Sequence, residues 1–192
     1  RGFIMTHSDH GHIDGTRLGE SFSNSTNLRV VELKRGALRG PLVLQTVTDR
    51  PGIVTDAELN FTTSGAVPEN GRINITLPKT ARGWTMISEN VSARVLQPAG
   101  MQVDTTWDPT LHTLALVIKT GSIAESSPVH LSIGGLETPT AETGPLNGTV
   151  ATYIANGEAV DFNTMTTERI KGTAHRDFSI TVKLAITVKS TG

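Results

Sequence analysis

The sequence alternates apolar and polar residues in short runs, and turn-forming residues separate one run from the next. Arg72–Leu77 and Leu111–Lys119 show the alternation clearly, and the turn tetrapeptide Pro68–Gly71 precedes the first of them. Successive side chains of a strand point to opposite faces, whereas an amphipathic helix repeats every 3.6 residues. The chain contains no convincing stretch of the helical period. The pattern therefore predicts an all-β protein, a β-sandwich of jelly-roll or immunoglobulin-like type with extended terminal strands.

The expected strands share this alternation. They are Leu28–Lys34, Pro41–Val47, Ala57–Thr62, Arg72–Leu77, Trp84–Ile87, Val91–Gln97, Met101–Trp107, Leu111–Lys119, Val129–Ile133, Thr149–Ile154 and Phe178–Lys189.

Composition narrows the possible functions. The 17 basic and 18 acidic side chains nearly cancel and form no basic stripe, so we expect no nucleic-acid partner. The chain has no cysteine, which excludes thiol catalysis and cysteine-bound zinc. The longest apolar runs, such as Leu114–Ile118, are too short to span a bilayer. Aromatic residues make up only 4%, so the core must consist of Val, Ile, Leu and Ala.

N-glycosylation sequons are the most specific motif. Five Asn-x-Ser/Thr acceptors occur among the nine asparagines, and they are Asn24, Asn60, Asn74, Asn90 and Asn147. Asn60 and Asn74 each stand between two apolar neighbours, so a strand would point them away from the core. The sequons predict a secreted, extracellular or cell-surface glycoprotein that carries covalent N-glycans and needs no other cofactor. The start at Arg1 fits removal of a signal peptide, although it also fits a truncated chain.

The two ends of the chain differ from its middle. Residues 1–27 are rich in Gly, Ser and His without sustained periodicity, and we expect an N-terminal arm there, ordered against a neighbouring subunit. Residues 28–192 then form a single β-sandwich domain that includes a long C-terminal strand, 177–190. One face of that strand is entirely apolar, and it consists of Phe178, Ile180, Val182, Leu184, Ile186 and Val188. Twelve residues extend over about 40 Å, roughly twice the usual length of a strand.

This long strand has two interpretations. It closes its own sandwich, or it completes the sheet of a neighbouring subunit by β-strand addition. Its position at a terminus makes exchange between copies topologically simple. The arm, with Phe3, Ile4 and Met5 as anchors, is the rival donor.

The middle of the chain contains an expected strand ending in Phe61-Thr62-Thr63, a Pro-x-x-Gly turn at 68–71, and a second expected strand ending in Leu77-Pro78. In these features it resembles a module of large extracellular β-rich glycoproteins of algae, oomycetes and other protists. Ile133–Pro139 and the stretch from Gly144 to Asp161 resemble the second half of that module. The resemblance implies an extracellular sandwich that is in some cases a subunit of glycosylated surface filaments. This chain departs from the tandem arrays of such proteins because it carries one module with its own terminal segments.

Metal binding and catalysis find little support. Five metal-ligating side chains fall within eight residues, and they are His7, Asp9, His10, His12 and Asp14. Ordering an arm around a metal is entropically costly, so we expect no functional metal there. His175-Arg176-Asp177 matches a kinase tripeptide without the other kinase motifs, and no Gly-x-Ser-x-Gly is present. Asp56 and Glu58 share a strand face, but exposed strand carboxylates are common, and we expect no enzyme.

Two functional hypotheses follow. The first is a structural subunit of an extracellular glycosylated filament or matrix, which forms homopolymers noncovalently by exchange of strands between copies. The alternative is a secreted carbohydrate-binding or adhesin module, in which Trp84, Trp107 and Tyr153 stack on sugars. A viral coat protein is a weaker possibility, because the chain has no basic arm for genome contact and carries five sequons.

Overall fold

The computed structural model describes residues 3–8, 11–17, 36–80, 83–87 and 91–172, and these residues contain strands and no helix. The chain divides into two compact units, Arg1–Lys34 and Arg35–Gly192. The first unit contains β1 (Phe3–Ser8) and β2 (Gly11–Arg17), which pair as an antiparallel hairpin. The sequence pattern had suggested no regular strand in this region.

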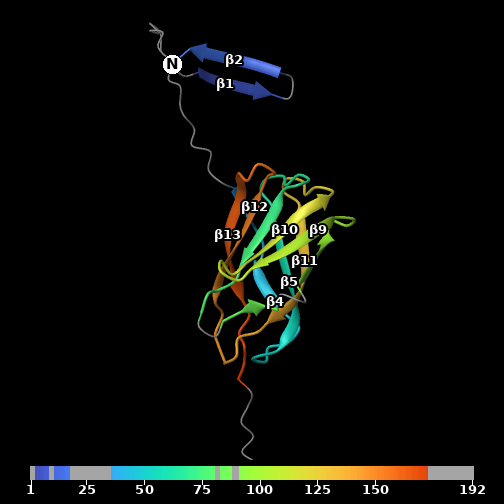
Figure 1. The fold of residues 1–192 in the computed structure, drawn as a ribbon, viewed down its shortest axis with the longest axis vertical. Helices are drawn as coiled ribbons and strands as arrows, with labels where there is room; N and C mark the ends of the chain where they lie inside the picture. The colour runs from blue at the N-terminus through green and yellow to red at the C-terminus, as the bar shows by residue number, and fades with distance from the viewer. Residues whose placement is uncertain (1–2, 9–10, 18–35, 81–82, 88–90, 173–192) are drawn as a thin grey trace, which may run out of the picture. The chain divides into compact units, whose positions relative to one another are not determined.

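The second unit contains eleven strands, drawn in Figure 1. They are β3 (Gly36–Ala37), β4 (Val43–Thr46), β5 (Val54–Thr62), β6 (Arg72–Thr76), β7 (Thr85–Met86), β8 (Ser92–Gln97), β9 (Gln102–Asp108), β10 (Thr113–Thr120), β11 (Pro128–Glu137), β12 (Asn147–Tyr153) and β13 (Ala159–Thr167). The expected β-sandwich class is confirmed.

The strands form one hydrogen-bonded path that folds into two layers. The order along the path is β7-β11-β5-β4-β13-β12-β6-β10-β9, with β8 also on β11 and β3 also on β13. All pairings are antiparallel except those of β13 with β3 and β4, which are parallel. The connection through β4 and β13 joins the β11–β5 layer to the layer of β12, β6, β10 and β9 (Figure 1).

Alternation along the strands builds the core between these layers. Leu59 and Phe61 of β5 are 0% and 3% exposed, and Ile73 and Ile75 of β6 are fully buried. The buried apolar cluster consists mainly of Leu, Ile and Val and includes the single fully buried tryptophan Trp84. The composition had predicted such an aliphatic core, because branched side chains pack well on pleated sheets.

Turn chemistry fixes several strand ends as the sequence suggested. In the turn before β6, Asn70 adopts a positive φ of 62°, and the Gly71 amide donates to the Pro68 carbonyl at 2.9 Å. Asparagine tolerates this left-handed conformation better than most residues do. The short turn between Pro68 and Gly71 therefore aligns β6 with β10 and β12, its two partners in the sheet.

The structure departs from the expected strands at several points. It adds β3 and β13, where the sequence pattern predicts no strand, and it begins β5 at Val54 instead of Ala57. It also extends β11 beyond Ile133 to Glu137 across a register shift. The expected strands Leu28–Lys34 and Phe178–Lys189 lie outside the described residues.

Candidate functional site

Three of the five predicted sequons lie on described residues. Asn60 is on β5 and Asn74 on β6, each between two buried apolar neighbours, so both side chains point outward from their layers. Asn147 is exposed at the first residue of β12. Asn24 and Asn90 lie outside the described residues. The three described acceptors are thus distributed over both layers of the sandwich.

Asn74 occupies the middle of its sheet face. Its cross-strand neighbours are Ala115 on β10 and Ala151 on β12, whose small side chains leave space above the sheet. The side-chain Oδ1 of Asn74 is buried and has no hydrogen-bond partner among the described residues. A glycan on the amide nitrogen would therefore leave from a half-buried position.

The predicted assembly strand lies outside the described residues, but the segment that leads into it is well anchored. Ile170 is fully buried, and its backbone exchanges two hydrogen bonds with Thr143, of 3.0 and 3.1 Å. The Lys171 amide donates to the Asp49 carbonyl at 2.8 Å. The last described residues before 173 are thus fixed to the sandwich.

Two ion pairs reinforce this exit. Lys171 Nζ lies 2.7 Å from Asp49 Oδ2, and an Arg169 guanidinium nitrogen lies 2.7 Å from Glu142 Oε1. The hydrogen bond from Lys171 and then its charge lower the pKa of Asp49 below its ordinary value. The hydrogen bond and charge of Arg169 lower the pKa of Glu142 in the same way. All four side chains are largely exposed, so each pair stabilises the fold only weakly.

The lateral edge of the sandwich, defined here as β8 and β9 with their connecting turn, carries a row of incompletely covered apolar side chains. β8 pairs with β11 and β9 pairs with β10, and within the described part of the chain no ladder joins β8 to β9. The partly buried residues that pack here against the core are Val91, Ala93, Met101, Val103 and Trp107. Each of these two strands therefore presents one backbone edge and an apolar border.

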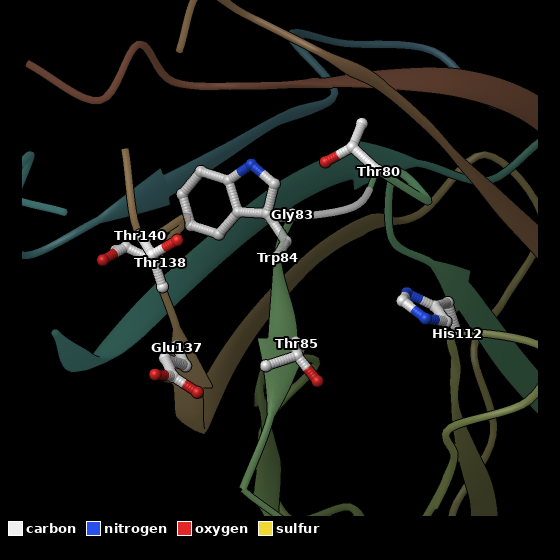
Figure 2. A pocket seen from close by; sticks show the side chains of 8 residues that line it. All are labelled: Thr80, Gly83, Trp84, Thr85, His112, Glu137, Thr138 and Thr140. Carbon is white, nitrogen blue, oxygen red and sulfur yellow. The ribbon is translucent and has the colours of Figure 1, made fainter. Parts of the chain in front are cut away.

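A recess of about 370 Å³ lies beside β7 (Figure 2). Its lining residues are Thr80, Gly83, Trp84, Thr85, His112, Glu137, Thr138 and Thr140. Figure 2 shows Glu137 and Thr85 projecting away from the indole nitrogen of Trp84. Trp84 Nε1 and His112 Nδ1 are buried without a hydrogen-bond partner among the described residues. Such groups usually bond to ordered water, so the recess suits water or another small polar molecule.

The structure does not gather the three aromatic residues proposed to stack on sugars. The side chain of Trp84 is fully buried, so protein atoms cover both faces of its ring. Trp107 pairs with the buried Leu114 and faces the core, and its ring lies 5.9 Å from that of His112. Tyr153 lies on the outward face of β12, beneath the Arg72 guanidinium at 4.6 Å. Trp107 and Tyr153 therefore face opposite sides of the same layer.

The candidate metal ligands fall in the first unit. His7 pairs with His12 across the hairpin, and Asp14 pairs with Thr6. Asp9 and His10 lie outside the described residues. In the parts of the chain that the structure describes, no three His, Cys, Asp or Glu side chains converge on a common metal position.

The carboxylates considered for catalysis lie on the outward face of β5. Glu58 Oε2 is 3.1 Å from His130 Nε2 on β11, and both side chains are partly exposed. Asp56 lies close to Gly134 on the same face, where a side chain at Gly134 would approach its carboxyl group. The arrangement is an exposed pair on a sheet face rather than an enclosed carboxylate pair.

Comparisons with known proteins gave similarities to solved structures alone. No protein-family model matches the chain, and no curated protein matches it. Among solved structures, the bacterial hydrophobin BslA aligns with a TM-score of 0.45 and 11% identity, over 75% of this chain and 99% of that one. A collagen-binding domain from a Staphylococcus aureus adhesin aligns with a TM-score of 0.37 and 11% identity, over 72% of this chain and 99% of that one.

A protein from Nocardia farcinica described as having an immunoglobulin-like fold gives a TM-score of 0.34 and 14% identity, over 66% of this chain and 99% of that one. These similarities concern the arrangement of strands, and no function is inferred from them. No helix in the described ranges is long and apolar enough to cross a membrane.

Sequence reasoning missed several of these features. The lateral edge, the recess and the buried carboxyl group of Asp161 all arise from pairings between distant segments. The half-exposed row Met101, Val103 and Trp107 was visible as a strand, but nothing in its local pattern shows that it lies at an edge.

Proposed function

We propose that this protein is a structural subunit of an extracellular glycosylated filament or matrix, whose copies assemble noncovalently by exchange of the strand 177–190. One observation carries the proposal. Among the described residues, the buried apolar cluster of the sandwich extends along the chain from Leu38 to Ile170. The sequence then continues with six further apolar side chains at period two, on Phe178–Val188, over about twice the usual length of a strand.

The energetics of this segment favour a partner. Each large aliphatic or aromatic side chain contributes roughly 1.5–3 kcal/mol when it is moved out of water, so six contribute on the order of 10 kcal/mol before entropy is counted. The anchored exit at Ile170 and Lys171 holds the start of this segment to its own sandwich. A neighbour that binds the segment is thereby tethered to this subunit.

The sequons support an extracellular polymer with restricted contacts. Asn60 and Asn74 point outward from the two different layers. Glycans there would prevent the sheet faces from stacking and would leave the edges and termini for contact between copies.

The test replaces apolar side chains of the exchanged strand in the full-length protein. The variant carries Val182→Asp, Leu184→Asp and Ile186→Asp, and its matched control carries Thr181→Asp, Ala185→Asp and Thr187→Asp on the opposite face. We expect the first variant to remain monomeric with the melting temperature of the wild-type sandwich, because in this proposal the strand is buried only in a neighbouring copy. We expect the control to assemble, as judged by sedimentation velocity and negative-stain electron microscopy.

Two results would refute the proposal. One is normal polymer from the apolar-face variant. The other is a monomer whose melting temperature falls steeply in the apolar-face variant alone, which would show that the strand closes its own sandwich.

A further inference from the structure

We infer that the lateral edge, at β9, is the surface that accepts strand 177–190 from a second copy of this chain. The inference rests on the proposed function and names the partner surface. β9 has β10 on one side, and no ladder on its other side among the described residues. A strand with one free side offers a row of backbone donors and acceptors to an incoming strand.

The side chains of β9 lack the cover that a neighbouring strand provides. On β10, the inward side chains Leu114, Leu116 and Ile118 are at most 1% exposed. On β9, the corresponding row of Val103, Thr105 and Trp107 is only partly buried, although Val103 and Trp107 pack against the same core. An added strand with one apolar face would continue the inner surface of this layer and cover that row.

The length of the donor segment fits this position. β9 has seven residues, and the alternating segment Phe178–Lys189 has twelve. The donor can therefore pair with the whole of β9 and still retain residues for the chain that links the two copies. Its six apolar side chains exceed the number needed to cover the inward row of β9.

Charge favours pairing of β9 with the donor strand over pairing of β9 with the β9 of a second copy. The outward face of β9 carries Asp104 and the strand ends at Asp108. Within Phe178–Lys189, the alternating part of the donor, the only charged residues are Lys183 and Lys189, both on its polar face, and Asp177 precedes them. Two β9 edges would bring like charges together, whereas the donor brings opposite charges. Asp104 already lies 3.2 Å from Lys119, but both side chains are substantially exposed, so this pair is weak.

The absence of cysteine makes a direct test simple. One full-length variant carries Thr106→Cys on the outward face of β9, and three others carry Thr181→Cys, Ala185→Cys or Thr187→Cys on the polar face of the donor segment. We mix the first variant with each of the others, allow assembly, and oxidise mildly. Because a disulfide forms only when the Cβ atoms lie about 4 Å apart, we expect one donor position to give an intermolecular cross-link with Thr106→Cys, identified by mass spectrometry of the linked peptides. The control variant Thr164→Cys, exposed on β13, should give none above background.

The outcomes separate this inference from the proposed function. If the wild-type protein forms polymer but Thr106→Cys cross-links no more than Thr164→Cys, or does not cross-link at all, β9 is not the accepting surface. The proposal of strand exchange would remain. A double variant that carries Thr106→Cys and a donor cysteine in the same copy extends the test, and a cross-link that forms in it only within one copy would reject both ideas.

A second measurement does not depend on disulfide geometry. Val103→Asp places a charge in the apolar row of β9, and Thr106→Asp places the same charge on the outward face. We expect Val103→Asp to raise the protein concentration needed for assembly by about tenfold or more, which corresponds to at least 1.4 kcal/mol per contact, and Thr106→Asp to change it little. Melting temperatures measured on the monomers report whether either variant harms the fold. Equal effects of the two variants on assembly would contradict the inference.

Discussion

A single buried carboxyl group organises one end of the sandwich. Asp161 on β13 is 0% exposed, and its Oδ2 accepts hydrogen bonds from the backbone amides of Ser64 and Gly65 at 3.0 and 3.1 Å. Its Oδ1 has no partner among the described residues and lies against Gly36 on β3. A Cβ at position 36 would collide with that oxygen, so only glycine fits there. Asp161 thus connects β13 to the loop after β5 and to the first strand of the unit.

Removal of this carboxyl group should destabilise the fold. Asp161→Ala leaves two buried amides without acceptors, and we expect a loss of about 2–4 kcal/mol in the free energy of unfolding. Asp161→Asn keeps one carbonyl acceptor and should lower the free energy of unfolding by roughly 1 kcal/mol. Gly36→Ala should lower it by about 1–3 kcal/mol, because the added methyl group overpacks the site.

Urea denaturation of the single variants and of the double variant Gly36→Ala/Asp161→Ala measures these losses. Because the alanine methyl group collides with the Asp161 carboxyl group, the double variant should lose less than the sum of the single losses. An Asp161→Ala variant as stable as the wild type would show that the two amides find other acceptors.

At the scale of the strand, β13 shows why local pattern was insufficient. It is a central strand, paired with β12 on one side and with β3 and β4 on the other. Its buried positions include Asp161 and Thr167, whereas Phe162 points outward and is 45% exposed. The usual relation between polarity and burial is thus reversed at several positions, and the alternation that revealed β6 and β10 does not appear. Hydrogen bonds between distant segments determine this strand, and a single sequence does not display them.

The segment that leaves β13 should respond to pH through its two ion pairs. Because Lys171 and Arg169 lower the pKa values of Asp49 and Glu142, the native state favours the ionised carboxylates more than the unfolded chain does. The resulting stabilisation is present above the ordinary carboxyl pKa of about 4 and is lost as the pH falls through the lowered native values. Salt should weaken it, since the pairs are exposed.

Carboxyl carbon NMR titration tests this assignment. Lys171→Met should raise the pKa of Asp49 without changing that of Glu142, and Arg169→Met should do the reverse. If either variant changes the pKa values of both carboxyl groups equally, the two ion pairs do not act independently.

At the scale of the whole molecule, the sequence predicted the architecture better than the functional surfaces. The strands β6, β9, β10 and β12 lie within two residues of their expected ends, because turn residues and alternation both act locally. The outward placement of Asn60 and Asn74 followed from the same alternation. The sequence did not predict the lateral edge or the recess, because both depend on which strands become neighbours after the chain has folded.

The positions of the sequons predict an order of glycan removal. In protein expressed in a glycosylating secretory host, an amidase acting on the native fold should release the glycan of Asn147 readily, because this residue is exposed at the start of β12. The glycan of Asn74, half-buried between Ala115 and Ala151, should resist release until the protein is unfolded. Peptide mapping after native and denaturing digestion detects the aspartate that the amidase leaves. Release of both glycans at the same rate in the native fold, or lack of a glycan on Asn147, would contradict the placement.

The parallel pairing of β13 with β3 and β4 determines how the sandwich would respond to tension. Gly36 lies opposite Asp161 and Leu44 lies opposite Thr167, so the strands that begin and end the unit run side by side in the same direction. A pull applied at the two ends of residues 36–172 would therefore act along these strands and strain their hydrogen bonds together, in shear, instead of opening them one after another. If copies assemble as proposed, a sandwich loaded in this way, with Ile170 bonded to Thr143, would pass a stretching force to its neighbour without unfolding.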